Sequence, residues 1–238
     1  MDAPHSVLPP SGAAAWSQCT LWLLMNATYP ETEASEASRE GDAAHWVVQQ
    51  LLTLAPVAVG TSAPNGVLVD QTMLDGAALI AADVHRHRGN AALIVEKKLP
   101  IARIHTQCYG TPDCWTQTAA RHVTVWDYKY GFGVVSPVEN WQFTAYALGI
   151  LDALELDTDM DDPVRIDFRL VQPRAPHPRG PVRTWQTTDV DMRAQANIMA
   201  TRANEAMAGR FTARTGPHCA HCRGLHACDA ARDAGPRL

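Results

Sequence analysis

Several features that identify common protein classes are missing from this 238-residue chain. No apolar run is long enough to span a membrane, and the N-terminus lacks the basic start and apolar core of a signal peptide. We therefore expect a cytoplasmic protein with no membrane partner. The sequence also contains no GxGxxG motif, no phosphate-binding loop and no internal repeat, so we do not expect a dinucleotide-binding fold.

Basic residues are scarce in the first two thirds of the chain. Residues 1–164 hold 8 Lys and Arg against 19 Asp and Glu, a net charge of -11, whereas residues 165–238 hold 12 against 6, a net charge of +6. The basic part is almost all arginine, which suits a phosphate backbone, although a solvated arginine-rich surface explains it equally well. The acidic part would repel DNA unless bound cations offset some of its carboxylates.

Hydrophobic periodicity predicts a mixed α/β fold with a central mixed sheet flanked by helices. The predicted helices cover residues 11–27, 33–54, 71–87, 138–156 and 189–209. The predicted strands cover residues 92–99, 103–109, 113–118, 122–130, 164–171 and 183–187, and those before residue 131 suggest an antiparallel meander. Ser11 is the expected cap of the first helix, and Thr188 or Asp189 that of the last.

The most informative stretch is Gly110-Thr111-Pro112-Asp113, followed after thirteen residues by Asp127-Tyr128-Lys129. Side chains alternate along a strand, so Asp127 and Lys129 should share one face, and Asp113 joins them if the hairpin register allows. Carboxylates bind Mg²⁺ or Mn²⁺, and a nearby ammonium can orient a water or stabilise charge on a phosphate. The other interpretation of the motif is an ordinary surface pattern across the strands.

The residues around this motif strengthen it. Gln142 and Tyr146 are spaced to share one face of the next helix, and Gly41-Asp42-Ala43-Ala44-His45 lies on an earlier helix. Together with Asp113 and Asp-Tyr-Lys, they resemble the PD-(D/E)xK nucleases, specifically the branch of RecB-type exonuclease domains and CRISPR adaptation nucleases. The resemblance implies a restriction-endonuclease-like core and a cytoplasmic protein of bacterial or phage origin.

The resemblance also implies roles for individual residues. His45, Asp113, Asp127 and the carbonyl of Tyr128 would bind the metal ion, and Lys129 would be catalytic together with the two aspartates. Gln142 and Tyr146 would contact DNA or support the site. Taken singly, His45 is more often an ordinary helix histidine, and Gln142 and Tyr146 are typical of an ordinary half-buried helix face.

A further likeness is to a phage-associated family of the same superfamily. It rests on the stretch from Asp127 to Val134, on Glu139-Asn140-Trp141-Gln142, and on Tyr146-Ala147-Leu148-Gly149. In that family a strand glutamate like Glu96 precedes the motif, so Glu96 is a further candidate for the site. A structural role for Glu96, paired with Lys97 or Lys98, is the alternative.

Six cysteines are unusual in a cytosolic chain, where disulfides rarely persist. Three follow the pattern C-x2-C-x5-C in the tail: Cys219, Cys222 and Cys228. The tail has almost no core of its own, so metal ligation would supply its folding energy, with Cys19 as the natural fourth ligand. Cys108 and Cys114 fall in predicted strands and are expected to be core thiols.

Either a [4Fe–4S] cluster or Zn²⁺ suits four cysteines. Zinc could instead take the three tail cysteines and one imidazole, from His218, His221 or His226. The arrangement of one distant and three clustered cysteines resembles the iron–sulfur nucleases of the superfamily, which implies a structural [4Fe–4S] cluster. We divide the chain accordingly into an N-terminal helical region (1–90), a nuclease core (91–212) and a cysteine tail (213–238).

We expect a Mg²⁺- or Mn²⁺-dependent DNA exonuclease or end-processing nuclease that acts on DNA with a free end. A recombination or replication protein is an expected partner. Two other classes of protein stay open: a non-catalytic module that binds DNA ends, and a structural subunit stabilised by zinc. Cleavage by the purified protein would distinguish the enzyme from both.

Overall fold

In the computed structural model of the chain, residues 6–30 and 35–235 are described. The helices are α1 (Ala13–Trp16), α2 (Leu21–Thr28), α3 (Glu36–Leu52), α4 (Gln71–His87), α5 (Trp141–Ala153), α6 (Arg193–Met207) and α7 (Asp229–Ala234). Short 3-10 turns are η1 (Pro10–Gly12), η2 (Pro217–His221) and η3 (Leu225–Ala227). The strands are β1 (Ile94–Val95), β2 (Leu99–Pro100), β3 (Tyr109–Gly110), β4 (Cys114–Ala119), β5 (His122–Tyr128), β6 (Arg165–Val171) and β7 (Val182–Thr188).

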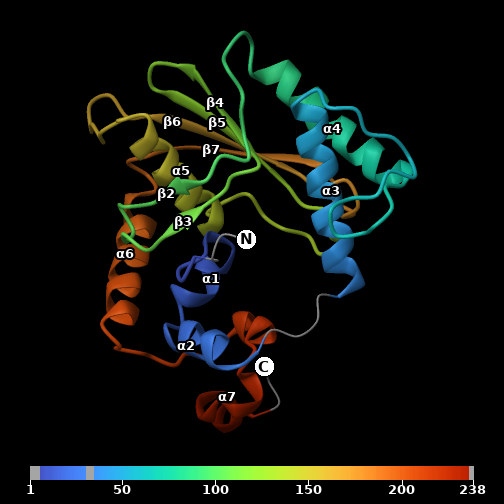
Figure 1. Cartoon of the computed structure of the whole chain (residues 1–238). Helices are drawn as coiled ribbons and strands as arrows, with labels where there is room; N and C mark the ends of the chain where they lie inside the picture. The colour runs from blue at the N-terminus through green and yellow to red at the C-terminus, as the bar shows by residue number, and fades with distance from the viewer. Residues whose placement is uncertain (1–5, 31–34, 236–238) are drawn as a thin grey trace.

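The larger sheet is mixed and has the strand order β1-β4-β5-β6-β7. Only the β5–β6 pair within it is parallel, because α5 connects these two strands across one face. Strands β2 and β3 form a separate antiparallel ribbon. Helices α3 and α4 cover one face of the sheet and α5 covers the other (Figure 1). The predicted mixed α/β architecture, a central mixed sheet flanked by helices, is confirmed.

Alternation along the strands divides the core between the two faces of the sheet. Trp126 and Tyr128 of β5 pack with apolar residues of α3 and α4, whereas Val125 packs with Phe168 of β6 and with α5. A third cluster joins α1 to α5 and α6, with Trp16 fully buried at its centre. This third cluster attaches the N-terminal helices to the sheet.

Several elements match their predictions closely. Helix α4 has the predicted bounds. Its start is fixed by the Asp70 side chain, which accepts the backbone N–H of Met73 and caps the helix. The predicted strands over residues 113–118 and 122–130 are also present, as the paired strands β4 and β5. Residues 33 and 34 of the second predicted helix lie outside the described residues. None of the helices within 6–30 and 35–235 combines the length and the apolar character that a membrane crossing requires.

The predicted continuous helix over residues 11–27 is wrong. It is broken into η1, α1 and α2, and Ser11 makes no capping hydrogen bond. The break between α1 and α2 is a tertiary effect, because Thr20 Oγ1 accepts the backbone N–H of Thr212 at 2.7 Å and Leu21 N–H donates to the Thr212 carbonyl. A contact with a segment about 190 residues away thus overrides local helix propensity.

Two predicted strands are also wrong. The strand over residues 92–99 is interrupted at Glu96, whose φ of 47° lies in the left-handed region and turns the chain out of β1. Residues 103–108 form turns in place of a strand, and only Tyr109 and Gly110 pair, with β2. The predicted meander is therefore limited to β1, β4 and β5.

Both helices of the second half begin later than predicted. Helix α5 begins at Trp141 because the Asn140 side chain accepts the backbone N–H groups of Gln142 and Phe143. Helix α6 begins at Arg193 after Met192, and neither Thr188 nor Asp189 caps it. Their side chains are used elsewhere: Thr188 accepts Asp191 N–H, and Asp189 accepts Val164 N–H at 2.8 Å.

Candidate metal-binding and catalytic site

Three carboxylates occupy one row at an end of the larger sheet. Glu96 follows β1, and its backbone N–H donates to the carbonyl of Asp113 at 3.0 Å. Asp113 precedes β4, whose first residue pairs with Trp126 of β5, so Asp113 stands beside Asp127. Residues in register on neighbouring strands lie side by side. The antiparallel pairs thus gather carboxylates that are 14 to 31 positions apart in the sequence.

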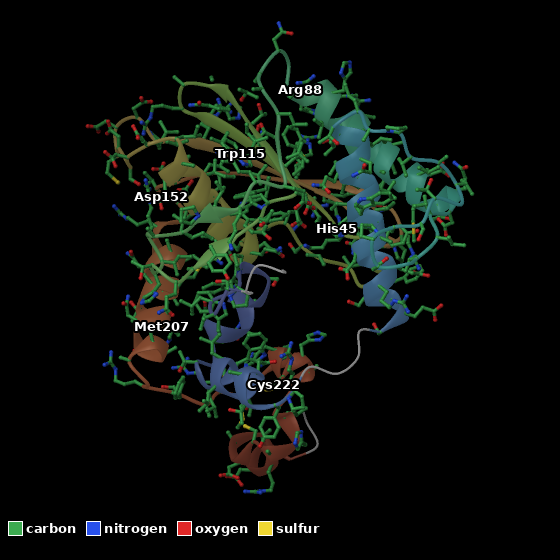
Figure 2. The ribbon with its side chains drawn as sticks, viewed as in Figure 1. His45, Arg88, Trp115, Asp152, Met207 and Cys222 are labelled. Atoms are coloured by element: carbon green, nitrogen blue, oxygen red, sulfur yellow. The ribbon has the colours of Figure 1, made fainter. Side chains whose placement is uncertain are left out.

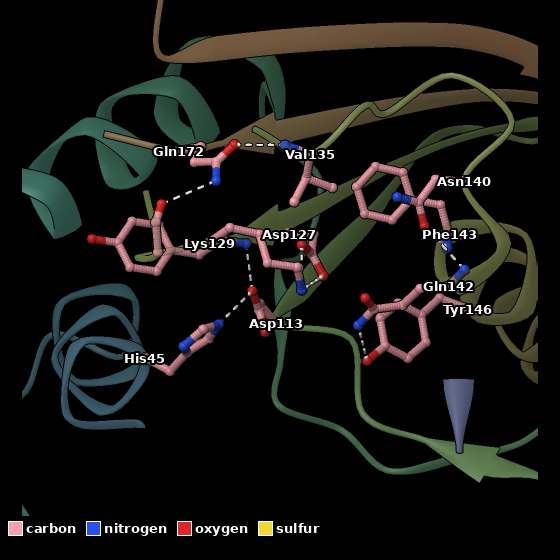
Figure 3. A network of polar contacts seen from close by, with 12 residues as sticks. His45, Asp113, Asp127, Lys129, Val135, Asn140, Gln142, Phe143, Tyr146 and Gln172 are labelled. Atoms are coloured by element: carbon pink, nitrogen blue, oxygen red, sulfur yellow. Dashed lines mark hydrogen bonds and ion pairs between the residues drawn. The ribbon is translucent and has the colours of Figure 1, made fainter. Parts of the chain in front are cut away.

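Lys129 forms an ion pair with the innermost carboxylate of this row. Its Nζ donates to Asp127 Oδ1 at 3.1 Å and lies 2.8 Å from Oδ2 (Figure 3). The Asp127 carboxylate is 1% exposed, and its Oδ2 has no partner in hydrogen-bonding geometry despite this short distance. A buried anionic oxygen with a free lone pair is suited to bind a cation.

Burial and the charges within the row shift the pKa values of its carboxylates and of Lys129. Burial, opposed by Lys129 and reinforced by Asp113, raises the pKa of Asp127 above its usual value. Burial alone would lower the pKa of Lys129, but Asp127 and Asp113 raise it, so the amine stays protonated. Burial, followed by the charge of Asp113, raises the pKa of Glu96 to about 7. The row therefore carries excess negative charge that a divalent cation would neutralise.

His45 reaches the carboxylate row from α3. Its Nε2 lies 3.6 Å from Asp113 Oδ2, and its Nδ1 lies 2.9 Å from the carbonyl of Gly41 (Figure 3). Because a carbonyl only accepts hydrogen bonds, Nδ1 carries a proton and Nε2 faces Asp113. This is the arrangement in which a backbone carbonyl orients a metal-binding imidazole.

Tyr128 contributes its backbone to the site and its side chain to the core. Its N–H donates to Asp113 Oδ2 at 2.5 Å, which holds this carboxylate between β5 and α3. The ring points to the other face, where its edge meets the ring of His45 at a centroid distance of 5.5 Å. The Tyr128 hydroxyl is buried without a hydrogen bond.

Gln142 and Tyr146 approach from α5, on the opposite side of the row from His45 (Figure 3). Gln142 Nε2 donates to the Tyr146 hydroxyl oxygen at 2.9 Å. Burial, followed by the charges of Asp127 and Asp113, raises the pKa of Tyr146, so its hydroxyl stays protonated. The structure thus brings together His45, Glu96, Asp113, Asp127, Lys129, Gln142 and Tyr146.

The donor set fits a hard divalent cation. It combines carboxylate oxygens, one of which lacks a hydrogen bond and lies in the ion pair with Lys129, with an oriented imidazole nitrogen. Within the described ranges, no group of three or more His, Cys, Asp or Glu side chains is already arranged around a common metal position. The pairwise distances would therefore have to contract when a cation binds.

The four predicted cysteine ligands line one small cavity, of about 20 Å³, between α2 and the C-terminal turns. Cys19 Sγ accepts Arg214 N–H at 3.5 Å, and Cys219 Sγ accepts Gly216 N–H at 3.4 Å. Burial, together with the three other thiols, raises the pKa of Cys222. Cys222 lies beside α2, far from His45 on α3 (Figure 2), so this cavity is separate from the carboxylate row.

The imidazoles of the tail differ in position. His218 lines the cysteine cavity, and its Nδ1 is buried without a partner, while its Nε2 lies 2.9 Å from the Arg214 carbonyl. His226 packs against Tyr29 at a ring distance of 4.8 Å. Of the imidazoles considered for zinc, His218 has the best access to the thiols. Cys108 and Cys114 are buried core thiols, as predicted.

Sequence reasoning missed a polar group beside the site. Gln172 follows β6, and its side chain donates to the carbonyls of Gly131 and Gly133 and accepts from Val135 N–H and from Arg183. It therefore holds the loop that follows Lys129. The only local signal is that Gln172 directly follows the predicted strand over residues 164–171 and opens a stretch rich in proline and arginine.

Comparisons with known proteins identify a family without an assigned activity. The family model described as "Protein of unknown function (DUF2800)" matches residues 5–237, and no curated protein matches the chain. The solved structure described as "Crystal structure of SSO0001" is similar at 10% identity, over 89% of this chain and 94% of that chain, with a TM-score of 0.37. The resemblance to PD-(D/E)xK nucleases thus stays a prediction. Since the family model covers nearly all of its residues, the chain belongs to the DUF2800 family.

Proposed function

We propose that this protein is a divalent-metal-dependent deoxyribonuclease with a restriction-endonuclease-like core. The observation that carries the proposal is the row of Glu96, Asp113 and Asp127, with Lys129 paired to its buried end and His45 facing its middle. Hydrolysis of a phosphodiester needs hard ligands for a cation beside a cationic group that stabilises phosphate charge. The carboxylates and His45 would supply the hard ligands, and Lys129 would supply the cationic group.

The residues that would hold Mg²⁺ or Mn²⁺ are Asp113, Asp127 and His45, with the carbonyl of Tyr128, and with Glu96 closing the row. When bound, the ion would supply Lewis-acid polarisation of the phosphoryl oxygen and lower the pKa of a bound water. Asp127 Oδ2, buried and without a hydrogen bond, is the ligand atom most clearly prepared for it. His45 Nε2 is directed toward Asp113 by the Gly41 carbonyl.

The chain's own groups have distinct tasks in this proposal. Lys129 stays protonated, so its Nζ stabilises negative charge on the phosphate and orients the attacking water. Tyr146 is held by Gln142 and faces the carboxylates as a neutral phenol, able to donate a hydrogen bond to a phosphate oxygen. Glu96, whose pKa is about 7, gives up a proton when a cation arrives.

The cysteine cavity is proposed to hold a structural metal group that joins Cys19 to the tail. The four thiols suit a [4Fe–4S] cluster, and the backbone N–H groups of Arg214 and Gly216 already point at two of the sulfurs. A zinc ion that uses His218 in place of one thiol is the alternative. Iron, sulfide and zinc contents of anaerobically purified protein distinguish the two.

The experiment that tests the nuclease uses end-labelled linear DNA, single- and double-stranded, and a circular control. Wild type should cleave in Mn²⁺ or Mg²⁺ and not in chelator, and an exonuclease or end-processing nuclease should spare the circle. Lys129→Ala should lose about two orders of magnitude in rate or more, because a charge-stabilising donor is removed. Lys97→Ala is the matched control, since that amine is exposed, and it should cleave like wild type.

Metal-independent DNA binding without cleavage in either ion would instead support a non-catalytic module that binds DNA ends. Cleavage by Lys129→Ala at the wild-type rate would exclude the mechanism above. A recombination or replication protein as partner is part of the same proposal and would be sought only after cleavage is established.

A further inference from the structure

Arg183 of β7 is a buried cation without an anionic partner among the described residues. It is 5% exposed, and its Nε and Nη1 are buried without a hydrogen bond. Its guanidinium donates from Nη2 to Gln172 Oε1, a neutral acceptor. Leaving a guanidinium buried and unpaired is costly, so an anion is expected beside it.

Two part-buried arginines of the protein, by contrast, are neutralised by carboxylates. Arg169, on the neighbouring strand β6, donates from Nε and Nη2 to the two carboxylate oxygens of Asp83. Arg103 donates from Nε to one carboxylate oxygen of Asp152, at 2.5 Å. Arg183 differs from these two, because no carboxylate of the described residues pairs with it, and a bound anion would lower the cost of its burial.

The pocket beside Arg183 contains further donors and no carboxylate. It has a volume of about 80 Å³, and its polar lining includes Ser136, His177, Arg179 and Arg183. Ser136 Oγ accepts Val138 N–H, so its hydroxyl proton is left to donate. His177 Nδ1 accepts Arg179 N–H, which directs a proton to Nε2. Burial, followed by Arg179, lowers the pKa of Arg183, as expected for cations gathered without an anion.

This pocket continues the row of the candidate active site. Asp127 pairs with Leu170 on β6, and Leu170 pairs with Arg183 on β7. Strands are about 4.8 Å apart, so the Cα atoms of Asp127 and Arg183 are roughly 10 Å apart along the row, on one face of the sheet. Gln172 ties the two places together, since it contacts both Arg183 and the loop after Lys129.

We propose that this pocket binds a backbone phosphate of the DNA strand whose neighbouring phosphate lies at the carboxylate row. The inference rests on the proposed function and adds the direction in which the strand leaves the site, across β6 toward β7. A guanidinium recognises phosphate oxygens through paired N–H groups, and the hydroxyl and imidazole complete the donor set. The pocket thus adds, beside a site with three carboxylates, positive charge beyond that of Lys129.

The test measures DNA binding in chelator, where no cleavage occurs, by anisotropy of a labelled single-stranded oligonucleotide at several salt concentrations. Arg179→Gln, at an exposed position where folding should be unaffected, and Arg183→Gln should each weaken binding roughly tenfold. Each should also reduce the log–log salt slope by about 0.7. Arg165→Gln, an exposed arginine at the other end of β6, is the matched control and should bind like wild type.

A second arm locates the contact on the DNA. Oligonucleotides with one phosphate replaced by a neutral methylphosphonate are scanned position by position. One position should weaken wild type roughly tenfold and leave Arg179→Gln unchanged, because the variant has already lost that contact. Inorganic phosphate is tested by thermal shift and competition in parallel. If it binds the pocket while Arg179→Gln and Arg183→Gln bind DNA like Arg165→Gln, the pocket serves a free anion and the strand contact is wrong.

The two proposals fail separately. Cleavage of DNA by wild type in Mn²⁺, with binding unchanged by Arg179→Gln and by a folded Arg183→Gln, would overturn the phosphate pocket alone. Weaker binding by both variants, with no cleavage by wild type, would overturn the nuclease and retain the pocket as part of a DNA-binding surface.

Discussion

His45 Nε2 and Asp113 Oδ2, 68 positions apart in the chain, lie 3.6 Å apart where α3 meets the start of β4. Asp113 Oδ2 also accepts the backbone N–H of Tyr128. One carboxylate oxygen is thus shared between a helix and a strand. This contact is what joins the helical half of the candidate site to the sheet.

Removal of this imidazole should weaken cation binding. His45→Gln is expected to reduce the affinity for Mn²⁺ by about 10- to 100-fold, because an oriented nitrogen ligand is lost. Calorimetric titration of the purified variant measures it. His85→Gln, at an exposed position of α4, is the control and should bind Mn²⁺ like wild type. Equal affinities for the two variants would remove His45 from the metal site.

Cation affinity should depend on pH through Glu96. Its pKa of about 7 means that the carboxyl is largely protonated below that pH, and a cation binds the ionised form. Affinity for Mn²⁺ should therefore increase as the pH rises from about 6 to about 8. Glu96→Gln should bind more weakly and lose most of this dependence. A wild-type affinity that is constant over this range would contradict the assignment.

The pair of Asp83 and Arg169 should stabilise the fold and set part of its acid sensitivity. Burial would raise the pKa of Asp83, but hydrogen bonds from Arg169 and Trp126 lower it below 3.8. Because the folded-state pKa is depressed, the contribution is present above the ordinary pKa and is lost as the pH falls through the lower folded-state value. Asp83→Asn should reduce the free energy of unfolding at pH 7 by about 3 kcal/mol.

Urea unfolding at pH 7 and at acid pH measures both effects. Asp75→Asn, an exposed carboxylate on the same helix, serves as the control and should change stability by less than about 0.5 kcal/mol. If Asp83→Asn and Asp75→Asn unfold alike at neutral pH, the buried pair contributes nothing.

Gly76 of α4 should be required because of Tyr128. A Cβ at this position would stand 2.3 Å from the Tyr128 hydroxyl oxygen, which lacks a hydrogen bond. Gly76→Ala is expected to destabilise by about 1–3 kcal/mol, and Tyr128→Phe in the same chain should recover much of the loss. Gly41→Ala, where a Cβ meets nothing within 4 Å, should instead stabilise by up to about 1 kcal/mol. Thermal melting of these three variants and of Tyr128→Phe alone measures the effects. If the effects of the two single changes add in the double variant, the hydroxyl is not the obstacle.

The cysteine cavity predicts a metal-dependent link between α2 and the tail. Cys19→Ala should lose most of its bound iron or zinc and should melt at a lower temperature, because this residue is the ligand from outside the tail. Cys108→Ala, at a buried core thiol, should keep its metal content. Equal metal contents in the two variants, measured by elemental analysis, would place the metal elsewhere.

Local sequence was sufficient for elements whose limits are set by their own side chains. Helix α4 begins after the Asp70 cap, and its apolar spacing matches a buried face. Strands β5 and β6 are largely buried, as expected for strands in a sheet that helices cover on both faces. The same local reasoning failed at Thr20, where a contact with Thr212 breaks the helix, and at Glu96, where a left-handed φ ends β1.

The candidate site shows the same division. The sequence alone determined which residues are candidates for the proposed chemistry, since the types, spacing and strand alternation of Asp113, Asp127 and Lys129, together with the resemblance to the nucleases, single them out. Only the tertiary structure decided that Glu96 joins their row and that Arg183 stands unpaired at its other end. Strand register and buried charge depend on hydrogen bonds between segments far apart in the chain, and no local pattern of side chains specifies them.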